Sequence, residues 1–119
     1  MSNISKGKYG EKLSCEYLIK KGYKIIETNY KYSRYGEIDI IALSPDDELC
    51  FVEVKTRFQN KFGTPLEAIT KDKLLKIYSC IKEYSSKTTL KYKRYRIDAI
   101  SIEIDENKPI INHIENIEI

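Results

Sequence analysis

Three residues in two neighbouring segments have the types and spacing of a metal-assisted catalytic site. Asp39 is followed fourteen residues later by Glu53, and Lys55 lies two residues beyond Glu53. Carboxylate oxygens suit Mg²⁺ or Mn²⁺ rather than zinc. An ammonium group beside such a cation could polarise a water molecule or stabilise charge growing on a phosphate. A solvated strand end with a Glu–Lys ion pair fits the same residues, and their spacing alone does not decide between the two interpretations.

Two strands must bring these groups together. The segments 37–44 and 49–56 are apolar on both faces except at the end distant from the Pro-Asp-Asp-Glu turn that joins them, where one face of each becomes charged. A three-residue loop over 45–47 would set Asp39 opposite Glu53, whereas a four-residue loop would place the two on opposite faces. We expect the first register or a bulged equivalent.

The remaining segments predict an α/β sandwich in the order α-β-β-β-α-β-β. A helix over 5–21 is capped by Ser5 and stopped by Gly22, and a helix over 70–84 carries an apolar stripe. Further strands are expected at 23–31, 96–104 and 110–118, with a turn at 33–36 and a polar loop at 57–65. An antiparallel start followed by a helical crossover predicts a mixed sheet. With no repeat or linker, residues 1–119 are expected to form a single domain.

Charge is distributed in blocks along the chain. The net charge is +3, but segment 37–54 holds six acidic residues and no basic one, and segment 55–96 holds twelve basic against three acidic residues. This asymmetry favours a polyanionic partner. Three widely spaced cysteines indicate a reduced, cytoplasmic protein. No segment is apolar enough for a membrane span, and the single histidine, His113, is expected to be an ordinary surface residue in a peripheral strand.

Several ordered strings beyond the Asp…Glu-x-Lys pattern carry a family resemblance. They are Gly10-Glu11, Gly22-Tyr23, Tyr35-Gly36-Glu37-Ile38-Asp39-Ile40-Ile41-Ala42, Phe51-Val52-Glu53-Val54-Lys55-Thr56-Arg57, Gly63, Pro65, Glu67-Ala68-Ile69 and Lys73. Together they resemble the bacterial YraN family of predicted endonucleases. That family belongs to the restriction-endonuclease-like PD-(D/E)XK superfamily and is similar to archaeal Holliday-junction resolvases. The resemblance spans about residues 6–103.

The resemblance implies a restriction-endonuclease-like α-β-β-β-α-β core and a site for Mg²⁺ or Mn²⁺. Asp39, Glu53, the Val54 carbonyl and Glu11 would be the ligands, and Lys55 the catalytic lysine. Glu11 also shares a helical stripe with Cys15 and Leu18, which predicts that its side chain faces inward. The alternative interpretation is a glutamate in the first turn of the helix that is favoured by the helix dipole and binds no metal. Glu37 would orient a ligand or act as one.

The resulting prediction is a Mg²⁺-dependent endodeoxyribonuclease acting on DNA, with branched or structured DNA as the favoured substrate. Basic residues interleaved with tyrosines would contact phosphates and unpaired bases; those singled out are Arg57, Lys73, Lys31, Arg34, Lys93 and Arg94. A non-catalytic nucleic-acid-binding or assembly module with the same fold is the alternative. A homodimer is left open.

Overall fold

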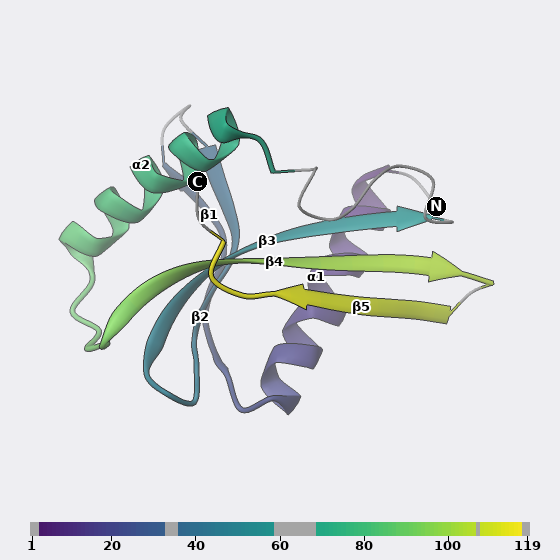
Figure 1. Cartoon of the computed structure of the whole chain (residues 1–119), viewed down its shortest axis with the longest axis horizontal. Coiled ribbons are helices and arrows are strands. Elements are labelled where there is room, and N and C mark those ends of the chain that lie inside the picture. The colour runs from purple at the N-terminus through teal and green to yellow at the C-terminus, as the bar shows by residue number, and fades with distance from the viewer. Residues whose placement is uncertain (1–2, 33–35, 59–68, 107, 118–119) are drawn as a thin grey trace.

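A five-stranded mixed sheet carries a helix on each face. The computed structural model describes residues 3–32, 36–58, 69–106 and 108–117. The elements follow one another as α1 (Asn3–Lys20), β1 (Lys24–Tyr32), β2 (Gly36–Leu43), β3 (Glu48–Phe58), α2 (Lys71–Lys87), β4 (Arg94–Asp105) and β5 (Lys108–Ile114). The strands lie side by side in the order β1-β2-β3-β4-β5 (Figure 1). The fold is therefore mixed α/β, as expected.

Strand directions follow the predicted pattern. β1, β2 and β3 are antiparallel neighbours, and the α2 crossover makes β4 parallel to β3. β5 returns antiparallel to β4. The β3–β4 ladder is continuous from Glu48–Arg94 to Phe58–Ile104 and forms the centre of the sheet.

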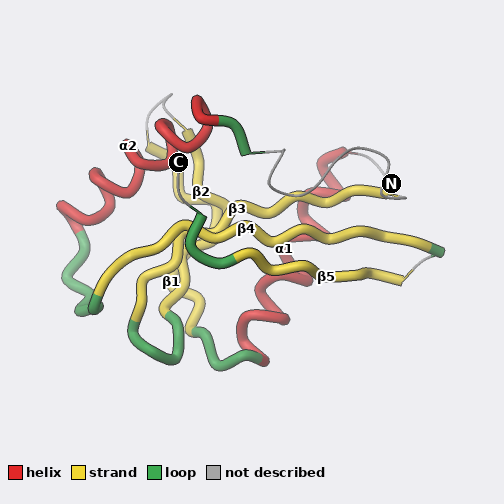
Figure 2. The backbone as a smooth tube through the Cα atoms, viewed as in Figure 1, coloured by secondary structure: helices red, strands yellow, loops and turns green. Residues whose placement is uncertain are grey.

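Each face of the sheet has its own apolar core. Leu74, Ile77 and Ile81 of α2 pack with Phe51 of β3 on one face. Leu18 of α1 packs against residues of the other face, among them Cys50, Val52 and Ile100. α1 passes behind β3, β4 and β5 in the view of Figure 2, whereas α2 lies beside the β1–β2 end of the sheet. The odd and even positions of β3 thus serve two different helices, which explains why this strand is apolar on both faces.

The ends of several elements differ from the sequence predictions. α1 begins at Asn3, so Ser5 lies within the helix and is not its cap. The stop at Gly22 is confirmed: its φ is +90°, and the Tyr23 N–H donates to the Leu18 carbonyl at 2.9 Å. β5 ends at Ile114 and not at 118, and Asn116 adopts a φ of 55° that a strand does not allow.

Other boundaries shift by a few residues. Arg57 and Phe58 still belong to β3, so the predicted loop at 57–65 begins later than expected. The rest of that loop, and residues 33–35 of the predicted turn, lie outside the described residues. Neither described helix has the length and apolar character required to cross a membrane.

Candidate active site

The β2–β3 hairpin has the register that a three-residue loop predicts. The Ser44 N–H donates to the Glu48 carbonyl at 2.8 Å, and the strands pair from Leu43–Leu49 to Ile40–Val52. The described pairing ends there, one step before Asp39 and Glu53, while β3 continues along β4. The two carboxylates therefore lie where β2 stops pairing with β3.

Asp39 lies at an interruption in β2. In a regular strand, residues i and i+2 point to the same face of the sheet. Ile38 and Ile40 do not: Ile38 packs into the core beneath α2, and Ile40 packs into the core beneath α1. In β1, Asn29 lies between the residues paired with Ile38 and Ile40, and its φ is 53°. Asp39 Oδ2 accepts a hydrogen bond from the Val54 N–H at 2.7 Å. The carboxylate thus binds a β3 backbone group beyond the end of the β2–β3 pairing.

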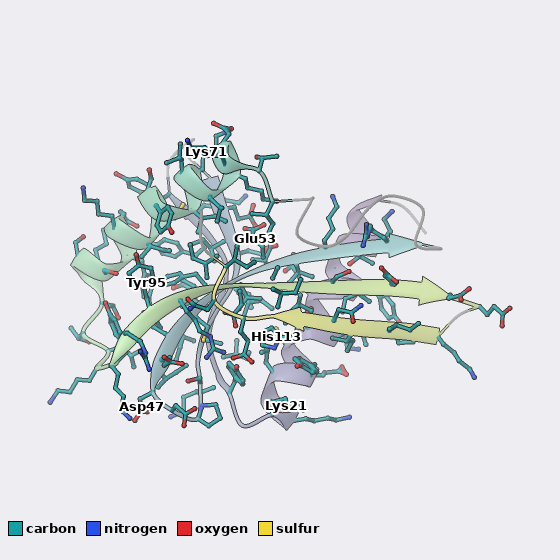
Figure 3. All side chains as sticks on the ribbon, viewed as in Figure 1. Lys21, Asp47, Glu53, Lys71, Tyr95 and His113 are labelled. Carbon is teal, nitrogen blue, oxygen red and sulfur yellow. The ribbon has the colours of Figure 1, made fainter. Side chains whose placement is uncertain are left out.

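Glu53 is buried and only half satisfied. Its Oε2 lies 3.0 Å from Nζ of Lys73, in the first turn of α2, whereas its Oε1 is buried without a hydrogen-bond partner among the described residues. The Thr70 side chain caps α2 by accepting from the Lys73 N–H at 3.1 Å, which fixes the backbone of Lys73 above Glu53. Figure 3 labels Glu53 within the sheet, toward the end of α2 where Lys71 lies.

The two carboxylates repel each other and two further acids. Burial raises the pKa of Asp39 to about 7; the charges of Glu53 and Glu11 add to this rise, while the Val54 N–H and Lys73 oppose it. Burial also raises the pKa of Glu53, Lys73 opposes this rise, and Glu37 and Glu11 increase it. Glu11 therefore repels both Asp39 and Glu53, and Glu37 adds to the repulsion at Glu53.

Glu11 reaches the site because α1 approaches β3 closely. A Cβ atom on Gly10 would lie 1.8 Å from Oγ1 of Thr56, so only glycine permits this approach without rearrangement. The half-buried Glu11 follows directly in α1. α1 and α2 thus bring Glu11 and Lys73 to the end of the β2–β3 pairing from opposite sides of the sheet.

Lys55 is exposed and forms no ion pair with another described residue. The expected alternative of a Glu53–Lys55 ion pair is therefore wrong, because the partner of Glu53 is Lys73. Lys55 remains available to contact a bound molecule. A pocket of about 270 Å³ reaches Glu53 and Lys73 but is not lined by Lys55; its lining residues are Gly36, Glu37, Glu53, Asp72, Lys73, Lys76 and Ile77.

Comparison with known proteins shows the family. A model of the "uncharacterised protein family UPF0102" matches residues 10–102. The chain belongs to the UPF0102 family. It is 41% identical to a UPF0102 protein of Syntrophomonas wolfei over 96% of this chain and 97% of the relative. It is also 44% identical to one of Clostridioides difficile, with 98% of each chain covered, and 40% identical to one of Sulfurihydrogenibium, with 98% of this chain and 96% of the relative covered.

The UPF0102 match contains every site residue discussed so far, from Glu11 to Lys73. Within the described part of the chain, the other basic residues singled out from the sequence are spread along the sheet, and of these Lys31 lies opposite Glu37 in the β1–β2 ladder. Arg57 pairs with Glu103 at 3.1 Å and is largely buried, and Arg94 pairs with Glu48 at the other end of β3. Lys31 and Lys93 are exposed. Arg34 lies outside the described residues.

The donor set suits a divalent cation only in part. Carboxylate oxygens and a buried oxygen without a partner, Oε1 of Glu53, fit Mg²⁺ or Mn²⁺. Among the described residues, however, no three His, Cys, Asp or Glu side chains are arranged to hold a metal ion. The carboxylates of Asp39 and Glu53 and the Val54 carbonyl could supply part of a metal-ligand set in this UPF0102 protein. The Glu53 carboxylate, however, already pairs with Lys73.

Sequence reasoning missed a second polar cluster, on the α1 face of the sheet. Asp98 is fully buried, and its carboxylate accepts hydrogen bonds from Arg96 Nε and from the Asn116 N–H. Its Oδ2 also lies 2.8 Å from His113 Nε2, within hydrogen-bond distance. The side chain of His113 is 7% exposed, and its Nδ1 lies 3.1 Å from the Tyr17 hydroxyl. The expectation that His113 is a surface residue is therefore wrong. The signal was Asp98, an acidic residue between the apolar residues Ile97 and Ala99 of β4.

Proposed function

We propose that this UPF0102 protein is a Mg²⁺- or Mn²⁺-dependent nuclease that hydrolyses phosphodiester bonds of branched or structured DNA. One observation carries the proposal: Asp39 and the half-satisfied Glu53 lie together where β2 stops pairing with β3, and Glu53 and Lys73 line a pocket. Buried carboxylates that repel each other destabilise a fold unless a cation compensates them, so this arrangement favours a metal-binding role.

The topology supports the proposal. An antiparallel β1–β2–β3 unit, a crossover helix and a parallel β4, preceded by α1, is the order expected for a restriction-endonuclease-like core. A fold hosts many functions, so the argument rests on the site and not on this likeness.

Each group would have a separate task. Asp39, Glu53 and the Val54 carbonyl would hold the cation, with Glu11 joining from α1 and Glu37 orienting a ligand. When bound, the cation would lower the pKa of a water ligand and neutralise charge developing on the phosphate. The exposed ammonium of Lys55 would donate hydrogen bonds to the attacking water or to a phosphate oxygen. Other basic residues would hold the DNA backbone away from the reacting atoms.

A non-catalytic nucleic-acid-binding or assembly module is the second candidate. Lys73 already neutralises Glu53, and the described residues contain no group of three side chains arranged as metal ligands. A protein that keeps this ion pair permanently would bind DNA without cleaving it.

The test is a cleavage assay with linear, single-stranded and four-way-junction DNA in Mg²⁺ or Mn²⁺. Asp39→Asn and Lys55→Ala should each lower the rate at least about 100-fold. Asp46→Asn, in the exposed β2–β3 turn, and Lys24→Ala, at an exposed position of β1, are the matched controls and should cleave like the natural sequence. Binding without cleavage by all five proteins would support the module instead.

A further inference from the structure

The ion pair between Glu53 and Lys73 is asymmetric. The Glu53 side chain is 8% exposed and belongs to the central strand of the sheet, whereas the Lys73 side chain is 43% exposed and reaches down from α2. Lysine has a flexible four-carbon stem and a strongly hydrated ammonium group. Separating the pair would therefore leave Glu53 in place and move Lys73 into solvent.

The ammonium compensates only part of the buried carboxylate. It binds Oε2, and Oε1 has no partner among the described residues. A buried carboxylate oxygen without a hydrogen bond or a cation is costly. A divalent cation carries twice the charge of an ammonium group, so it would compensate the Glu53 carboxylate more completely.

The surroundings leave room for the lysine to move. Lys73 lines the pocket beside Glu53, together with Lys76, whose ammonium pairs with Asp72 at 3.3 Å on the exposed surface of α2. The Thr70 cap holds the backbone of Lys73, so its side chain can rotate without a change in the helix.

We propose that Lys73 is a resident counter-cation of Glu53 that a divalent metal ion displaces. This inference rests on the proposed function, because it assumes that the metal binds at Glu53. In the metal-free protein Lys73 neutralises the buried carboxylate; when the metal binds, the ammonium leaves Oε2 and turns into the pocket. Lys73 then becomes available for a phosphate only when the metal is present, so a site without metal would not bind its substrate productively.

Two measurements test the exchange. In the first, Mn²⁺ affinity is measured by calorimetry at pH 8 for the natural sequence, for Lys73→Met and for the control Lys76→Met. Methionine keeps the length of the side chain and removes the charge that competes with the metal. Lys73→Met should bind Mn²⁺ at least about tenfold more tightly, a usual size for coupling between two ligands, and Lys76→Met should bind nearly as the natural sequence does.

The second measurement uses the unaltered protein and so does not depend on how a variant folds. Acetic anhydride labels lysines in proportion to the accessibility of their amino groups, and mass spectrometry resolves Lys73 from Lys76. Mn²⁺ should speed the labelling of Lys73 several-fold and leave that of Lys76 unchanged.

The possible failures are distinct. Equal or weaker Mn²⁺ binding by Lys73→Met, or unchanged labelling of Lys73, would overturn the exchange and leave a metal-dependent nuclease standing. No Mn²⁺ binding by any of the proteins would overturn both proposals.

Discussion

At the scale of single residues, the site is built at the expense of folding stability. Asp39 is half-buried beside other acids, and its pKa is raised to about 7 by loss of solvation and by the charge of Glu53. A carboxyl group whose pKa is higher in the folded than in the unfolded chain favours folding only while it is protonated. Stability is therefore lost as the pH rises from the unfolded pKa of about 4 through the raised folded value.

Replacing Asp39 should consequently stabilise the metal-free protein. In Asp39→Asn the amide oxygen can still accept from the Val54 N–H, while the repelling charge is gone. We expect a gain of about 1–3 kcal/mol at pH 8 and only about 0.5 kcal/mol at pH 4, where the folded carboxyl is protonated and about half of the unfolded chains carry the proton. Urea unfolding in EDTA at both pH values measures the difference, with Asp46→Asn as the exposed control. A variant less stable than the natural sequence at pH 8 would show that the charge is compensated in the folded state.

At the scale of elements, much of the arrangement was predictable because it depends on local rules. The three-residue turn fixed the register of the hairpin, Gly22 ended α1, and the crossover helix made β3 and β4 parallel. The interruption at Asp39 was not predictable, because it depends on Asn29 in the neighbouring strand. Lys73 was expected to contact nucleic acid, and its pairing with Glu53 depends on how α2 lies over the sheet, which sequence spacing does not encode.

Two glycines of α1 test how closely this helix must approach β3. Alanine favours a helix interior over glycine by about 1 kcal/mol, so Gly7→Ala, with nothing within 4 Å of its new Cβ, should stabilise the protein. Gly10→Ala gains the same helix preference but meets Oγ1 of Thr56 at 1.8 Å, and should destabilise the protein by about 1–2 kcal/mol. Thermal unfolding compares the two variants. Stabilisation by both would show that Thr56 yields easily and that α1 can withdraw from the site.

At the scale of the whole molecule, the cluster around Asp98 joins segments that are distant in the sequence. Arg96 also pairs with Glu48 and Glu115, and the Ile117 N–H donates to the Ile97 carbonyl at 2.7 Å. Together with His113 and Tyr17, these contacts tie α1, the start of β3 and the segment after β5 to β4. The cluster lies on the α1 face, whereas Glu53 pairs with α2 on the other face, so stability and the proposed chemistry depend on separate groups of charges.

Asp98→Asn tests this separation. Burial alone would raise the pKa of Asp98, but hydrogen bonds from His113, Arg96 and the Asn116 N–H hold it below its ordinary value. Its stabilising contribution is therefore present above the unfolded pKa of about 4 and is lost as the pH falls through the lower folded value. Removing the charge leaves the buried Arg96 partly unpaired, and we expect a loss of about 3–5 kcal/mol at pH 7.

Urea unfolding at pH 7 measures that loss, and the exposed Asp105→Asn, at the far end of β4, is the matched control with little expected effect. At a temperature where the variant stays folded, its Mn²⁺ affinity should equal that of the natural sequence, because among the described residues neither Asp39 nor Glu53 forms a hydrogen bond or ion pair with this cluster. A variant that keeps its stability would show that Glu48 and Glu115 compensate Arg96 without Asp98. A folded variant that loses Mn²⁺ binding would show instead that the two faces of the sheet are coupled, with β4 as the element they share.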